Sequence, residues 1–182
     1  MKKGVLYLND RVEDGEALMT RALLKRAGFD ITTATSGKQL DIRTFFGLQV
    51  KADTQLMSIE EKNYDFLVVP GGRYVSETID HSDDIQALIR AFDQKNKVVA
   101  AICAGPRFLG RAGVLDGKKF TAFTGSEQDA PEGIYKPKLK VVSDGNIITA
   151  RGAGAIYEFV FEIVSALGNR KQAKKLLADI LY

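Results

Sequence analysis

The sequence predicts one α/β domain over residues 1–182, with a doubly wound, mostly parallel sheet and helices on both faces. Two apolar runs, residues 66–69 and 98–102, suit strands of a parallel sheet that is covered on both sides. Strand-like and helix-like segments alternate along the chain, as in doubly wound sheets. The 182 residues are 45% hydrophobic and contain no linker, repeat or low-complexity segment. That length is enough for a single sizeable core.

In the first half of the chain, residues 5–8 form a short apolar run that predicts the first strand. Apolar residues between 17 and 27 recur at helical spacing, and Gly28 stands where a C-terminal cap belongs. Residues 31–35 are rich in β-branched side chains and predict the second strand. The stretch 45–57 is less regular, and we expect a short edge strand or hairpin near residues 48–50.

In the second half, Ser82 followed by Asp83 and Asp84 predicts the start of a helix. After the strand at 98–102 we expect a helix over residues 104–112, closed by Gly113, and a strand over residues 119–123. Residues 139–142 and 147–150 flank a polar turn and predict a small β-hairpin. A buried helix over 155–167 and a final helix over 171–181 complete the expected order.

Composition excludes several classes of function. The net charge is only +3 and the densest basic cluster, residues 170–175, reads as a solvated helix face, so we expect no nucleic-acid partner. No apolar run is long enough for a bilayer, and the apolar stretch at 5–8 is too short for a signal peptide. The single cysteine cannot form an internal disulfide, so we expect a cytoplasmic protein. No His and Cys cluster predicts a metal site.

Cys103 directly follows an apolar strand and is flanked by small residues, which is the pattern of a nucleophile elbow. The turn would place the thiol at the carboxyl edge of the sheet, where such folds bind ligands. A helix beginning just beyond it would favour the thiolate, so we expect a pKa below that of a free thiol. A buried, inert cysteine is the alternative.

Three segments resemble the ThiJ/PfpI superfamily, and specifically its DJ-1-like branch. They are residues 100–106 (AAICAGP), residues 64–72 (YDFLVVPGG), and residues 150–154 (ARGAG) followed by YEF at 157–159. Their order and spacing follow the family's, and the resemblance covers nearly the whole chain. It implies a flavodoxin-like (Rossmann-like) fold of the glutamine-amidotransferase type, and a homodimer. The pair Phe45 and Phe46, with the weak strand near Leu48, would be part of a surface that needs cover.

The resemblance also implies the site residues. Cys103 would be the nucleophile, and the match to the family's catalytic glutamate falls on Glu16, whose carboxyl pKa burial would raise. Glu13 and Asp14 fit exposed acids at a helix start. Backbone N–H groups of Gly71, Gly72 and Ala104 would bind a substrate oxyanion. Arg151 would line the same edge and hold an anion, or form a structural ion pair.

One position departs from the pattern. Related enzymes often carry a histidine near the cysteine, at a place that falls on Phe123 in this chain. The only histidine, His81, is expected at a helix start remote from the elbow. Protease or amidase chemistry then lacks its general base.

Three functions remain open at this point. The first is an enzyme without a cofactor that acts on small reactive carbonyls, as a glyoxalase III-like lyase or a deglycase. The second is a stress-response protein that senses an oxidant through Cys103 without turning over a substrate. The third is a fold retained for assembly without chemistry.

Overall fold

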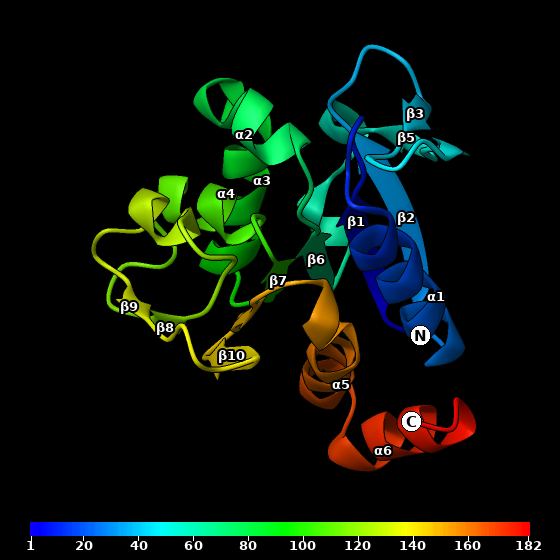
Figure 1. Ribbon diagram of the computed structural model, residues 1–182. Helices are drawn as coiled ribbons and strands as arrows, with labels where there is room; N and C mark the ends of the chain where they lie inside the picture. The colour runs from blue at the N-terminus through cyan, green and yellow to red at the C-terminus, as the bar shows by residue number, and fades with distance from the viewer.

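The computed structural model describes all 182 residues around one seven-stranded sheet of order β10-β11-β7-β6-β1-β2-β5 (Figure 1). Every neighbouring pair in it is parallel except β10 and β11, which form an antiparallel hairpin. The strands of this sheet are β1 (Lys3–Tyr7), β2 (Asp30–Thr35), β5 (Thr54–Gln55), β6 (Phe66–Val69), β7 (Val98–Ile102), β10 (Val141–Asp144) and β11 (Ile147–Ala150).

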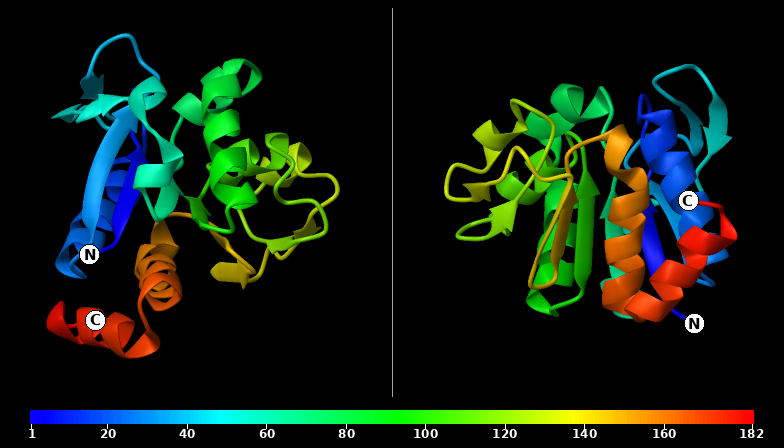
Figure 2. Two further views of the ribbon diagram at one scale, coloured as in Figure 1. Left: turned by 180° about the vertical axis from the view of Figure 1, so that it is seen from behind. Right: turned by 60° about the horizontal axis from the view of Figure 1, so that its bottom comes forward.

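Helices cover both faces of the sheet, as the apolar strands require. Helices α1 and α5 contact each other and cover one face, while α3 and α4 pack on the other (Figure 2). Helix α6 packs against α5. The helices are α1 (Thr20–Arg26), α2 (Tyr74–Thr78), α3 (Asp83–Gln94), α4 (Pro106–Arg111), α5 (Ile156–Leu167) and α6 (Arg170–Asp179).

Short elements join these parts. A π-helical turn, η1 (Gly15–Met19), leads into α1, and two small two-stranded sheets lie outside the main one. These sheets pair β3 (Asp41–Arg43) with β4 (Gln49–Lys51), and β8 (Lys119–Phe120) with β9 (Ile134–Tyr135). The 3-10 turns are η2 (Leu56–Ser58), η3 (Glu61–Asn63), η4 (Ile79–His81), η5 (Ser126–Asp129) and η6 (Ala153–Ala155).

The central strands carry the core because both of their faces are covered. All four residues of β6 and the last four of β7 are buried. The parallel register sets Val69 beside Ala101 and Ile102 beside Ala150. The carboxyl ends of β6, β7 and β11 therefore meet at one edge, where the loops carrying Gly71, Cys103 and Arg151 emerge.

The expected fold class is confirmed, and so are the strands at both apolar runs. The hairpin expected over 139–142 and 147–150 is also present, but its first strand runs over Val141–Asp144. The hairpin near residues 48–50 is also present, with β3 as its second strand. Gly28 and Gly113 have left-handed φ angles of +85° and +75°, as caps require.

Three expectations need correction. The predicted strand over 119–123 ends at Phe120, and it pairs with β9 rather than joining the main sheet. The helix after the elbow begins at Pro106 rather than Ala104, because residues 103–105 form the turn itself. Ser82 precedes α3 but does not cap it, since its hydroxyl donates to the Ile79 carbonyl at 2.7 Å.

None of the helices combines the length and the apolar character that a bilayer crossing requires.

Candidate active site

Cys103 lies on a strained turn between β7 and α4. Its φ is +61°, a left-handed conformation that costs a non-glycine residue about 1–2 kcal/mol. The turn is tight because its backbone crosses close to the end of β6. A Cβ on Gly105 would stand 2.3 Å from the Val69 carbonyl oxygen, so only glycine fits there. The predicted nucleophile elbow is therefore present, with a half-buried, free thiol at its tip.

Glu16 reaches the cysteine from η1, the turn that follows β1. Its side chain is 1% exposed, and its Oε2 accepts a hydrogen bond from the Gly71 N–H at 2.9 Å. The Ala153 N–H also donates to this carboxylate, and the Cys103 thiol hydrogen-bonds it. The Glu13 carboxylate, one turn earlier, accepts from the Glu16 N–H at 2.6 Å. The loops that follow strands β1, β6, β7 and β11 thus all meet at the Glu16 carboxyl group.

Gly71 is the position where these groups meet. A Cβ built there would lie 2.6 Å from Glu16 Oε2, 2.7 Å from Cys103 Cβ and 3.0 Å from the Ala104 nitrogen. Real Cβ atoms do not approach other atoms that closely. The glycine is therefore needed for Glu16 and Cys103 to lie side by side.

Burial dominates the electrostatics of the pair. Burial raises the pKa of Glu16 to about 7, against a lowering by its hydrogen bond with Cys103, so the expected direction is confirmed. Burial also raises the pKa of the Cys103 thiol, and the Glu16 charge raises it further; the hydrogen bond from the Ala104 N–H opposes both. The predicted lowering of the thiol pKa is therefore wrong for the thiol beside an ionised Glu16. Loss of contact with water outweighs the benefit of a short helix start.

A cavity of about 480 Å³ opens in front of the pair. It brings together four of the predicted site residues: Glu16, Cys103, Phe123 and Arg151. The remaining lining comes from Ala122, Thr124, Pro137, Gly152, Ala153 and Gly154. Sequence reasoning missed Thr124 and Pro137, because they lie on loops whose course no periodicity predicts. Ala153 could have been found, since it sits inside the 150–154 motif.

The N–H groups of the three predicted oxyanion donors differ in the hydrogen bonds they make. The Gly71 N–H is taken by Glu16, so it is not available to a substrate oxygen. The Ala104 N–H hydrogen-bonds the Cys103 sulfur. Gly72 bridges to Val12, and its N–H makes no hydrogen bond within the chain.

Phe123 stands at the cavity with 57% of its surface exposed, and its N–H donates to the Cys103 carbonyl at 2.8 Å. No histidine lines this cavity. The only one, His81, ends η4 and lines a different cavity. The expectation that no Cys-His pair forms within the chain is confirmed.

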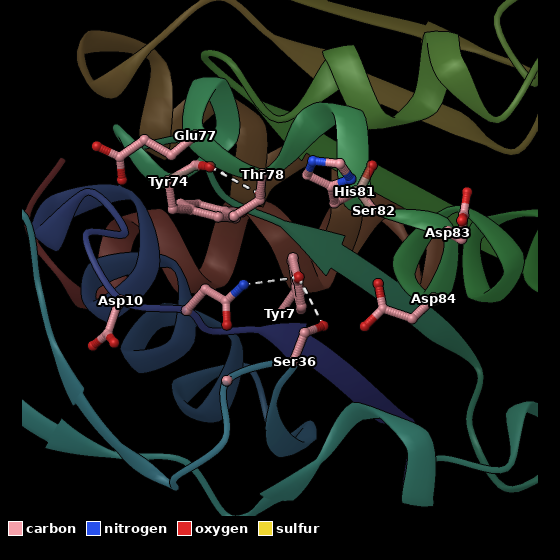
Figure 3. Close-up of a pocket in the computed structure, with 12 residues that line it drawn as sticks. Tyr7, Asp10, Ser36, Tyr74, Glu77, Thr78, His81, Ser82, Asp83 and Asp84 are labelled. Atoms are coloured by element: carbon pink, nitrogen blue, oxygen red, sulfur yellow. Dashed lines mark hydrogen bonds between the residues drawn. The ribbon is translucent and has the colours of Figure 1, made fainter.

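That second cavity is larger, about 580 Å³, and lies where the strand order reverses between β1 and β6 (Figure 3). The Tyr7 hydroxyl lies at its floor, hydrogen-bonded to Ser36 and Asn9 at 2.9 Å each. Burial raises the pKa of Tyr7 far above its ordinary value. Four carboxylates line this second cavity: Asp10, Glu77, Asp83 and Asp84. It contains no thiol, and the hydroxyls of Tyr7, Ser36 and Ser82 are all hydrogen-bonded within the chain. The Cys103 cavity is therefore the candidate for chemistry despite its smaller volume.

Comparison with known proteins finds similarity over almost the whole chain. The model of the DJ-1/PfpI family matches residues 2–166. The deglycase PfpI of Pyrococcus furiosus is 32% identical over 165 residues, which cover 90% of this chain and 98% of that protein. Protein dj-1beta of Drosophila melanogaster is 29% identical over 181 residues, covering 99% and 97%. The solved structure of oxidized Toxoplasma gondii DJ-1 superimposes with a TM-score of 0.90 at 29% identity, covering 100% and 99%.

Proposed function

The chain belongs to the DJ-1/PfpI family, and on that basis we propose that it converts small reactive carbonyl compounds, with Cys103 as nucleophile and Glu16 as acid and base. One observation carries the proposal. A thiol on a strained turn hydrogen-bonds a buried carboxyl group whose pKa is about 7, at an open cavity. Such a carboxyl exchanges protons readily at neutral pH, as general acid–base catalysis requires. Deglycases are among the relatives.

The first step joins the thiol to the substrate. As the Cys103 sulfur attacks the aldehyde carbon, the S–C bond forms and the carbonyl π bond breaks. Glu16 takes the thiol proton and passes it to the new alkoxide oxygen, which gives a hemithioacetal. The Ala104 N–H lies close to the sulfur and is the donor nearest to that oxygen among those expected, since the Gly71 N–H is taken by Glu16 and Gly72 does not line the cavity.

With a 2-oxoaldehyde, Glu16 then moves a second proton. The carboxylate removes the hydrogen on the sulfur-bearing carbon as a proton and returns it to the neighbouring carbon, while the hydroxyl proton of the sulfur-bearing carbon passes to the former ketone oxygen. The aldehyde carbon is thereby oxidised while the ketone carbon is reduced. The product is a thioester of a 2-hydroxy acid. Water cleaves it and restores the thiol, with no cofactor consumed.

The test is methylglyoxal consumption, followed together with formation of the 2-hydroxy acid. Cys103→Ala and Glu16→Ala should each abolish product formation, while circular dichroism shows that both variants remain folded. Consumption that continues unchanged in Cys103→Ala would contradict the proposal.

A second candidate is oxidant sensing through Cys103. The thiol is free and only half-buried, and one similar protein was solved in an oxidized form. A reducing compartment such as the cytoplasm would hold the thiol reduced until an oxidant arrives. Intact mass after mild peroxide distinguishes the two functions. Sensing would be favoured if the protein gains one or two oxygens, Cys103→Ala prevents this gain, and no carbonyl is consumed. If neither oxidation nor carbonyl consumption occurs, a role in assembly alone is the function that remains.

A further inference from the structure

Arg151 is a cation without a partner at the Cys103 cavity. Its guanidinium forms no ion pair and no hydrogen bond, although its backbone N–H donates to the Lys140 carbonyl. The neighbouring cation differs, because Lys140 pairs with Glu158. The alternative of a structural ion pair for Arg151 is therefore wrong. An exposed guanidinium lining a cavity is free to bind an anion there, preferably a carboxylate.

The sheet register brings Arg151 close to the nucleophile. Ile102 and Ala150 are paired across β7 and β11, and each is followed directly by a site residue, Cys103 and Arg151 respectively. The Cys103 N–H also donates to the Ala150 carbonyl at 2.9 Å. Since paired strands lie about 4.8 Å apart, the two backbones emerge side by side.

Among the residues that line the cavity, Arg151 alone carries a charge that stays the same during a turnover. Glu16 and Cys103 together hold the protons that the reaction moves, so their charge changes during a turnover. The Glu13 charge also acts on the Cys103 thiol, but Glu13 does not line the cavity. A substrate anion would thus meet one permanent positive charge on the β11 side of the thiol.

Resting on the proposed function, we propose that Arg151 makes this cavity select carbonyl compounds that carry a carboxylate next to the carbonyl, that is, small aldehyde acids and 2-oxo acids, and that Cys103 binds them as reversible adducts. The carboxylate would contact the guanidinium while the neighbouring carbonyl carbon faces the sulfur. The bonds formed and broken are those of the first step described above. The reaction stops there, because these compounds do not have an aldehyde carbon next to a ketone carbon. Neutral 2-oxoaldehydes would enter the same cavity without this contact.

Two alkylating reagents of nearly equal size test the charge preference without requiring turnover. Iodoacetate is an anion and iodoacetamide is neutral, so the ratio of their rates with Cys103 reports the charge that the thiol's surroundings prefer. In Arg151→Gln, that ratio should fall roughly three- to ten-fold, the size expected for one partly exposed charge at close range. Arg151→Lys should keep most of the ratio. Arg26→Gln, which removes a positive charge at the far end of α1, should leave it unchanged.

Protection of Cys103 from iodoacetamide then tests the class of ligand, measured as the concentration of glyoxylate that halves the labelling rate. We expect Arg151→Gln to raise that concentration by a similar factor, and to raise it more than the corresponding concentration of propanal, a small neutral aldehyde. An alkylation ratio that is the same in Arg151→Gln and the wild type would overturn the inference, even if Cys103-dependent turnover is found. If the ratio depends on Arg151 but methylglyoxal is not consumed, the charge selection stands and the proposed function fails.

Discussion

At the scale of single residues, the chemistry of this protein is concentrated in one shared proton between Cys103 and Glu16. Burial disfavours the thiolate and the carboxylate alike, and the presence of one charge disfavours the other. The pair therefore loses its first proton as a unit. The Glu16 carboxyl pKa of about 7 sets the pH at which the pair loses this proton, so the reactive form of the site is present in the neutral range.

The pH dependence of Cys103 alkylation should follow that first proton. Below pH 7 Glu16 is protonated and cannot accept the thiol proton, so the rate is low; it should rise to a plateau as the carboxylate forms. We expect a midpoint near 7, below the value of about 8.5 for a free thiol. Iodoacetamide labelling from pH 5 to 10 measures it.

Glu16→Gln should move that midpoint upward by at least about one unit, because the buried thiol must then ionise alone. Glu13→Gln is the matched control. It removes a nearby charge that raises both pKa values, so its midpoint should fall slightly. Equal midpoints in the wild type and Glu16→Gln would rule out a shared proton.

Phe123 sets a limit on the reactions that follow. Its apolar ring lines the cavity at the position where related enzymes often carry a histidine, so the lining offers no base besides Glu16. General-base assistance is worth about 10²–10⁴ in rate. We expect no release of coumarin from fluorogenic peptide substrates. Peptidase turnover that Cys103→Ala abolishes would instead imply a base supplied by another subunit.

At the scale of elements, the wall of the cavity is attached to the elbow helix through Asp129. This carboxylate belongs to the last residue of η5, six residues beyond Phe123, and Asp129 is 8% exposed. It accepts hydrogen bonds from Arg107 and, at 2.5 Å, from Arg111, both on α4. Helix α4 begins just after Cys103, so these ion pairs fix the loop that carries Phe123 relative to the elbow.

Asp129→Ala should destabilise the fold by about 1–3 kcal/mol, the usual worth of hydrogen bonds to charged groups, because two arginines lose a buried partner. Asp80→Ala is the control. It removes the exposed partner of Arg111 at 3.2 Å, and should cost less than about 0.5 kcal/mol. Urea denaturation measures both. Equal losses of unfolding free energy in the two variants would show that the burial of Asp129 adds nothing to the stability of the fold.

At the scale of the whole molecule, the largest exposed aromatic feature is the turn of the β3–β4 hairpin. Phe45 and Phe46 pack edge to face with ring centroids 4.9 Å apart, yet Phe46 remains 72% exposed. Leu48 beside them is 53% exposed. Figure 1 shows this hairpin projecting at the end opposite to helix α6.

Such a patch favours association, so we expect light scattering to give the mass of a homodimer at micromolar concentration. Phe46→Glu should shift the population toward the monomer. Leu181→Glu is the control, because it places the same charge on a residue 94% exposed at the other end of the molecule. A monomer mass for the wild-type protein would contradict the expectation.

The sequence by itself determined the fold class and the position of the nucleophile. Apolar runs such as Phe66–Val69, and the small residues around Cys103, act through local geometry, which a linear pattern records. It could not determine the extent of the strand at residue 119. Phe120 pairs with Tyr135 and leaves Ala122 and Phe123 to line the cavity, a choice that depends on contacts made elsewhere in the chain.

Only the tertiary structure decided how the site residues are used. Gly71 was expected to serve a substrate, but its N–H is directed at Glu16, 55 positions earlier in the chain. The thiol pKa rises rather than falls because burial, which depends on everything packed around a group, outweighs the local helix start. Arg151 forms no ion pair within the chain, whereas Lys140, whose charge acts on it, pairs with Glu158. Hydrogen bonds, desolvation and charge pairing act between groups that are distant in sequence, and folding alone brings those groups together.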